Sequence, residues 1–219
     1  MEEKKVLIVI GAGPGSGLAV ARRFASEGFR PALLGRSQES MDELCEALAG
    51  EGVEAYAAPI DLLDADDVRH SVAAVGERFG RIDVLHFNPS VWRDRGVLEL
   101  TVPELLEDVT FGAGALLPAV QAAHPFLRRG SRILVTGSMA ADAPAVAAPS
   151  LGIQKAAVRT LATALDKTLE PEGIRAVTMQ VNGALAKEGP FAPVAVADAL
   201  WAASDRPDEE WSSYVPLNG

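Results

Sequence analysis

Short apolar runs alternate with helical patterns along the whole chain, and this alternation limits the possible folds more than any other feature. The runs are nearly continuous in apolar residues, which is typical of strands buried on both faces of a sheet. The expected strands cover residues 6–10, 30–35, 53–60, 82–87, 133–136 and 174–181. One helix is expected after the first strand and its glycine turn. The other expected helices cover 39–49, 65–79, about 102–127, about 150–169 and a stretch near Val194. The alternation predicts an α/β fold, a doubly wound parallel sheet in a Rossmann-type three-layer sandwich.

The length and composition favour one dinucleotide-binding domain over residues 1–219. The chain has 219 residues, of which 48% are hydrophobic, enough for a sizeable core. Neither a Ser- or Gly-rich linker nor an internal repeat interrupts it. We expect an acidic surface loop at 205–210, followed by a short last strand or a docked tail at 211–219.

The charge balance narrows the choice of partners. A formal net charge of −10 argues against nucleic acid and anionic membranes, which both require a basic face, so we expect a small-molecule ligand. The single cysteine, Cys45, excludes an intramolecular disulfide, and the sequence offers no candidate metal site. The apolar runs are too short to cross a membrane, and the charged stretch Met1–Lys5 does not resemble a secretory signal. We therefore expect a cytoplasmic protein.

A glycine-rich turn, residues 11–17, separates the first strand from the first helix. Gly11, Gly15 and Gly17 fit the spacing G-x-x-x-G-x-G, and Ser16 stands where the more common G-x-G-x-x-G pattern needs a glycine. A turn at this place can direct backbone amides and a helix N-terminus toward a pyrophosphate. The alternative is a tight strand-to-helix connection without a ligand. The repeated alternation that follows favours phosphate binding.

The end of the second strand bears on the choice of cofactor. A protein that prefers NAD usually places an acid there to bind the ribose 2′-hydroxyl, but this chain has Gly35 and Arg36. A guanidinium can pair with a 2′-phosphate, so the sequence favours NADP(H) over NAD(H). The alternative is an ordinary exposed arginine.

These features resemble the short-chain dehydrogenase/reductase family over essentially the whole length. Gly11, Gly15 and Gly17 match the family's glycine motif. By this resemblance, Asp61 and Leu62 would contact adenine, and Asn88 would support the sheet near the cofactor. The resemblance implies a nicotinamide cofactor and an oxidoreductase that acts on a carbonyl or alcohol substrate.

The catalytic group that the resemblance implies is only half present. Ser138 would hold a substrate oxygen, and Lys155 would bind the nicotinamide ribose. Leu151 stands where the family has its catalytic tyrosine, and leucine can neither donate nor accept a proton. Also, no asparagine occurs between Val102 and Leu127, where the family has one.

Other residues offer a replacement acid or shape the pocket. Asp142 is the first candidate acid, while His86 is better explained as a core histidine in a strand. The stretch after the sixth expected strand is shorter than in the family, which would leave the pocket open. Trp92, Met139 and Phe191 indicate an apolar pocket.

Three functions stay open at this stage. The first is a divergent NADP-dependent reductase that takes its proton from water or a loop acid. The second is an NADP-binding sensor or regulatory protein, which Leu151 favours, and the third is a non-redox lyase, cyclase or isomerase on the same scaffold. The helices expected at about 102–127 and 150–169 resemble those through which family members associate, so we also expect a homodimer or homotetramer. Small residues that would allow close helix packing there, or equally packing on the sheet, are Ala156, Ala157, Ala162 and Ala164.

Overall fold

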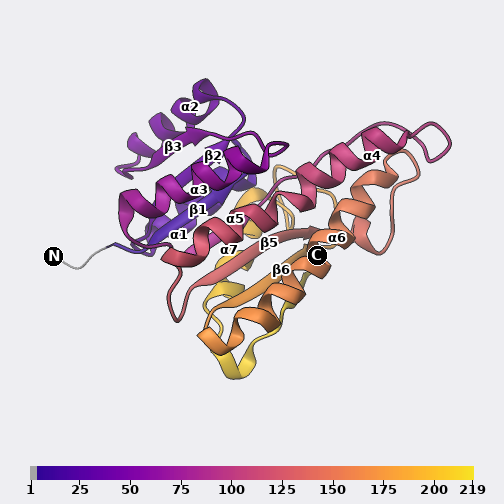
Figure 1. Ribbon diagram of the computed structural model, residues 1–219. Coiled ribbons are helices and arrows are strands. Elements are labelled where there is room, and N and C mark those ends of the chain that lie inside the picture. The colour runs from indigo at the N-terminus through magenta and orange to yellow at the C-terminus, as the bar shows by residue number, and fades with distance from the viewer. Residues whose placement is uncertain (1–3) are drawn as a thin grey trace.

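A computed structural model describes residues 4–219, which form a parallel sheet between two layers of helices (Figure 1). Residues 1–3, part of the charged stretch from which a cytoplasmic location is predicted, lie outside the described residues. The seven strands follow the order β3-β2-β1-β4-β5-β6-β7, and every neighbouring pair is parallel. The predicted doubly wound α/β fold is confirmed.

The elements follow one another in the predicted alternation. The strands are β1 (Val6–Ile10), β2 (Arg30–Gly35), β3 (Tyr56–Pro59), β4 (Val84–Phe87), β5 (Arg132–Ser138), β6 (Arg175–Val181) and β7 (Tyr214–Leu217). The helices are α1 (Ser16–Ser26), α2 (Gln38–Ala49), α3 (Ala65–Phe79), α4 (Val102–Val109), α5 (Leu116–Ala123), α6 (Pro149–Leu169) and α7 (Pro193–Ser204). Helices α3, α5 and α6 share one core cluster with the sheet, and α1, α2 and α7 share the other.

The helix expected at about 102–127 is interrupted, which corrects the prediction. A capping box of Thr101 and Glu104 begins α4, and a π-helical turn, Thr110–Gly114, separates it from α5. A Cβ atom on Gly112 would collide with the side chain of Gln154 on α6. The wider turn and its glycines therefore let this stretch pass close to α6, although glycine lowers helix propensity.

Smaller differences concern element ends. The strands expected at 53–60 and 82–87 form ladders only over Tyr56–Pro59 and Val84–Phe87, whereas β5 is longer than expected. The last segment is a strand, because β7 pairs with β6. Within residues 205–210, Asp208–Glu210 form a 3₁₀ turn instead of a featureless loop. None of the helices among residues 4–219 is long and apolar enough to span a bilayer.

Part of the α6 surface proposed for association is covered by the chain itself. Ala162 is fully buried, and Ala157 packs against the same core cluster. Ala162 therefore cannot form an exposed helix contact, and Ala157 is partly covered by the core.

Candidate functional site

One cleft lies along the carboxyl ends of the strands and contains the cofactor-binding and catalytic residues that the sequence predicts, but not the candidate acid Asp142 or Phe191. Its volume is about 1460 Å³, larger than the roughly 300–1,000 Å³ typical of small-molecule pockets. The predicted residues along it are Gly11, Gly15, Ser16, Gly17, Arg36, Asp61, Leu62, Asn88, Ser138, Leu151 and Lys155. The cleft spans the point where the strand order reverses between β1 and β4, which is where parallel α/β sheets bind ligands.

The glycine turn brings the start of α1 into the cleft. Gly11 has a φ of 76°, and its amide donates to the carbonyl of Leu34 at 2.9 Å. A Cβ atom on Gly17 would lie 3.0 Å from the Cα of Ala12, so this position accepts only glycine without a shift of the backbone. No side chain caps the start of α1 at Gly15. Its first backbone amides can therefore bind an anionic group of a ligand.

Arg36 and Asp61 lie at the β2 and β3 side of the cleft. Arg36 is exposed directly after β2 and forms no hydrogen bond or ion pair with the described residues. Asp61 accepts the amide of Leu63 through Oδ1 at 2.9 Å, and its own amide donates to Asp67 at 2.7 Å. Leu62 is buried in the core beneath this end. The free guanidinium is the cationic group available to a ligand here.

Lys155 is buried at the floor of the cleft. Its Nζ donates to the carbonyl of Pro89 at 3.0 Å and to that of Thr136 at 2.9 Å. An ammonium has three N–H groups, so one of them has no acceptor among the described residues. Burial lowers the pKa of Lys155 to about 8.

Ser138 and Leu151 complete this side of the cleft. Ser138 ends β5, and its Oγ accepts the amide of Ala140 at 3.2 Å, which leaves the hydroxyl hydrogen free to donate. Leu151 lies in the first turn of α6, about one helical turn before Lys155. Asn88 donates through Nδ2 to the carbonyl of Gly11 at 3.3 Å and so links β4 to the glycine turn.

His86 is a buried strand residue, as the sequence predicts. Its side chain is inaccessible, and its Nε2 lies 2.8 Å from Thr136 Oγ1. Burial, with a smaller contribution from the charge of Lys155, lowers the pKa of His86 to about 3. The ring is therefore neutral at physiological pH.

Asp142 is unsuited to be the replacement acid, which corrects the first choice from the sequence. It pairs with Arg159 at 2.9 Å and accepts from Gln180 at 2.8 Å. These contacts hold the pKa of Asp142 below its usual value, so the carboxylate has no proton to give near neutral pH. Neither Asp142 nor a tyrosine is among the residues around the cleft.

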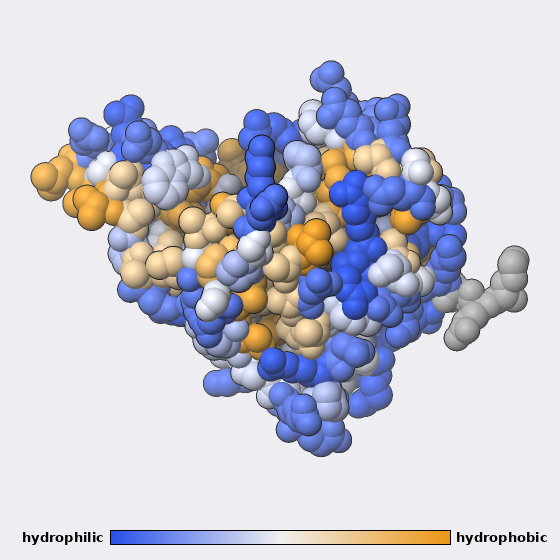
Figure 2. Space-filling model, turned by 180° about the vertical axis from the view of Figure 1, so that it is seen from behind, coloured by the Kyte–Doolittle hydropathy of each residue, from blue (hydrophilic) through white to orange (hydrophobic). Residues whose placement is uncertain are grey.

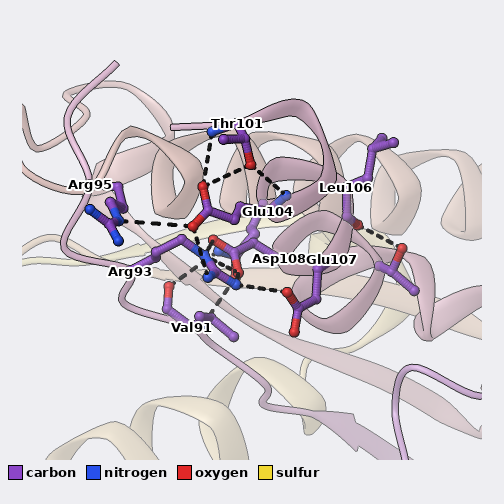
Figure 3. Close-up of polar contacts among 10 residues, drawn as sticks. Val91, Arg93, Arg95, Thr101, Glu104, Leu106, Glu107 and Asp108 are labelled. Carbon is purple, nitrogen blue, oxygen red and sulfur yellow. Dashed lines mark hydrogen bonds and ion pairs between the residues drawn. The ribbon is translucent and has the colours of Figure 1, made fainter. Parts of the chain in front are cut away.

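The segment after β4 is held by contacts that the sequence does not predict. Gln154 on α6 donates to the carbonyl of Val91 and accepts its amide, both at 3.2 Å. Arg93 binds Asp108 of α4 at 2.8 Å (Figure 3). A buried glutamine one residue before the lysine offers no recognisable pattern, because its partner is a distant main-chain group. Phe191 was wrongly assigned to the pocket, since it packs against Gly183 in the core cluster of α1 and α7.

Comparison with known proteins identifies the family. A family model described as short chain dehydrogenase matches residues 5–186. The chain belongs to the short-chain dehydrogenase family. It is 26% identical over 170 residues to tropinone reductase-like 3 of Erythroxylum coca, covering 77% of this chain and 66% of that relative. It is 29% identical over 188 residues to an uncharacterized oxidoreductase of Methylorubrum extorquens, covering 85% of this chain and 75% of the relative.

A solved structure agrees with this family. A short chain dehydrogenase from Burkholderia cenocepacia in complex with NADP superposes with a TM-score of 0.88 at 26% identity. The superposition covers 100% of this chain and 97% of the other. This family member thus shares the predicted fold with a protein that binds NADP.

Proposed function

We propose that this short-chain dehydrogenase family member binds NADP(H) in the cleft and interconverts a carbonyl compound and its alcohol. The observation behind the proposal is that one continuous cleft joins the glycine turn, Arg36, Ser138 and Lys155. The bound cofactor would supply or accept a hydride. The likeness to a relative in complex with NADP supports the choice of cofactor.

The chain offers suitable contacts for each part of such a cofactor. The uncapped start of α1 suits the pyrophosphate, and the exposed Arg36 suits a 2′-phosphate. The unused N–H of Lys155 suits a ribose hydroxyl or another acceptor at the floor of the cleft. Asp61 and Leu62 border the end where the adenine would lie.

The proton for carbonyl reduction would come from Lys155, assisted by the Ser138 hydroxyl. Leu151 has no proton to give, and His86 is neutral and completely buried. Lys155 is the only cationic side chain on the β4–β6 side of the cleft among the described residues. Its pKa of about 8 leaves it largely protonated at neutral pH and able to act as an acid there.

A second candidate is an NADP(H)-binding sensor without turnover, and Leu151 favours it. The leucine side chain lies in the cleft wall and leaves the site without the hydroxyl that the family resemblance implies. The two candidates share the cofactor half of the cleft. They differ in whether a bound carbonyl compound is reduced.

A fluorescence titration with NADPH and NADH tests the shared half. We expect tighter binding of NADPH than of NADH, and a loss of that preference in Arg36→Ala. Arg69→Ala removes the same charge from an exposed position of α3 outside the cleft and should keep the preference. Failure to bind either nucleotide would refute both candidates, whereas binding followed by NADPH oxidation with a panel of ketones would separate the reductase from the sensor.

Association into a homodimer or homotetramer stays part of the proposal. Apolar residues gather at the protruding end of the molecule formed by the start of α4 (Figures 1 and 2). Exposed apolar side chains there are Val97, Leu98, Val102 and Leu106. Light scattering during gel filtration would measure the assembly, and Leu106→Glu should shift it toward the monomer.

A further inference from the structure

Charged residues are distributed unevenly along the cleft. On the side of β1, β2 and β3, the lining includes Arg36, Glu43, Asp61 and Asp67. On the side of β4, β5 and β6, the only charged lining residue among those the structure describes is Lys155. The second side, which extends beyond the proposed cofactor contacts, therefore consists almost entirely of neutral groups.

Besides Phe111, large apolar side chains on this neutral side include four that we call the apolar wall: Trp92, Met139, Leu151 and Leu185. Trp92 is 60% exposed and Leu185 61%, so most of their surface is uncovered, and Met139 is 42% exposed. Small residues, Ala140, Ala143 and Ala145, also line the cleft. The apolar wall thus offers uncovered apolar area inside a cleft, where a ligand can bury it.

Contacts of the two neighbouring residues hold the chain on both sides of Trp92. The main chain of Val91 is held at two points by Gln154, which is fully buried. Arg93 forms a bidentate pair with Asp108, whose side chain is only 1% exposed, and Figure 3 shows this pair between Glu104 and Glu107. A ligand therefore meets an indole that projects from an ordered segment and need not order the main chain there, which lowers the entropic cost of binding.

Lys155 does not make this side suitable for an anion. Two of its three N–H groups donate to the carbonyls of Pro89 and Thr136 at the floor, and the proposed function gives the third to the cofactor or the substrate carbonyl. Its side chain is also almost completely buried. A carboxylate placed against the apolar wall would lose water without gaining an ionic partner there. Such desolvation is costly, and the net charge of −10 adds a further repulsion.

We propose that the β4–β6 side of the cleft binds an uncharged, apolar carbonyl compound against Trp92 and Leu185 and discriminates against carboxylates. That the ligand is a carbonyl compound rests on the proposed function. The binding preference itself follows from the apolar wall alone. It therefore holds for a reductase and for a sensor.

Calorimetric titration with a matched pair of ketones tests the preference. The probes are 4-phenyl-2-butanone and 4-(3-oxobutyl)benzoate, which differ by one carboxylate, and both are titrated at pH 7 with and without saturating NADP⁺. We expect the neutral ketone to bind at least ~10-fold more tightly than the carboxylate, corresponding to one ionic group left unpaired. Equal affinities, tighter binding of the carboxylate, or no binding of the ketone would overturn the proposal.

Two pairs of variants localise the effect. Trp92→Ala should weaken ketone binding about 10-fold, whereas Val194→Ala, at an exposed residue outside the cleft, should leave it unchanged. Leu185→Arg should bring carboxylate binding to or above that of the ketone, and Val194→Arg, exposed but outside the cleft, should not. Unchanged affinities in Trp92→Ala and Leu185→Arg would overturn the proposed location. A separate NADPH titration of each variant shows whether the cofactor still binds. Loss of cofactor binding is thereby distinguished from loss of ketone binding at the apolar wall.

Discussion

His86 Nε2 lies 2.8 Å from Thr136 Oγ1, which joins the buried ring on β4 to a side chain of β5 that lines the cleft. The Nδ1 atom of the same ring is buried and has no partner among the described residues. A second proton on this ring would be buried without an acceptor, which agrees with the pKa of about 3 that burial imposes on His86. Protonation of the His86 imidazole is therefore unfavourable in the folded state.

Stability should fall as the pH falls from 6.5 toward 3. The unfolded chain binds a proton at His86 near pH 6.5, but the folded chain binds it only near pH 3. The unfolded state therefore holds more protons in this window, and the free energy of unfolding drops by up to about 1.4 kcal/mol per pH unit. Urea unfolding between pH 7 and 4.5 measures this slope.

A double variant isolates the contribution of His86. His86→Leu with Thr136→Val removes both partners together, so neither is left unpaired, and it should flatten the slope between pH 6.5 and 4.5. Asp142 and Glu104 are carboxylates with lowered pKa values, and their contribution to the free energy of unfolding is lost mainly at lower pH. Identical slopes in the two proteins would show that His86 does not control stability in this range.

Leu151→Tyr should raise ketone reduction if the rest of the site is intact. The tyrosine would place a phenol in the first turn of α6, one turn before Lys155. A positioned general acid contributes typically ~10²–10⁴-fold, so the gain in kcat/KM could reach this range. Leu151→Phe is the matched control, because it adds the ring without the hydroxyl. No gain in Leu151→Tyr, with NADPH binding unchanged, would count against a reductase pocket.

Local sequence patterns predicted the fold, but they did not predict the break between α4 and α5. Continuous apolar strands and alternating helices were sufficient to predict the parallel sheet, because each pattern reports burial in its own segment. The break between α4 and α5 depends on contact of Gly112 with Gln154, which lies in a distant segment. The only local sign of this long-range contact in the sequence is the glycine at position 112.

The candidate site divides in the same way. The glycine turn and Arg36 were found because their roles depend on position after a strand, and the structure places them along one cleft. Asp142 was wrongly favoured as an acid because its partners, Arg159 and Gln180, come from other elements. The contacts that hold the chain on both sides of Trp92 were missed for the same reason.

Gln154→Leu should weaken ketone binding more than NADPH binding. The change removes both hydrogen bonds to Val91 and leaves its amide and carbonyl unpaired, which costs about 1–3 kcal/mol for each group that stays buried. The segment with Trp92 then loses one of its two attachments. Thr160→Leu is a control on the exposed side of α6 that removes a hydrogen bond only within the helix. Equal losses of ketone and NADPH affinity would indicate a general structural defect instead.

Reductase activity should decline as the pH rises through about 8. Lys155 donates a proton only as the ammonium, and its lowered pKa means that the neutral amine predominates above about pH 8. The initial rate of NADPH oxidation with a saturating ketone, measured from pH 6.5 to 9.5, should therefore fall up to 10-fold per pH unit at the alkaline end. NADPH binding measured over the same range separates this loss from release of the cofactor. In Lys155→Met the pH dependence should disappear together with most of the activity, and a rate that stays level to pH 9.5 in the unmodified protein would show that another group supplies the proton.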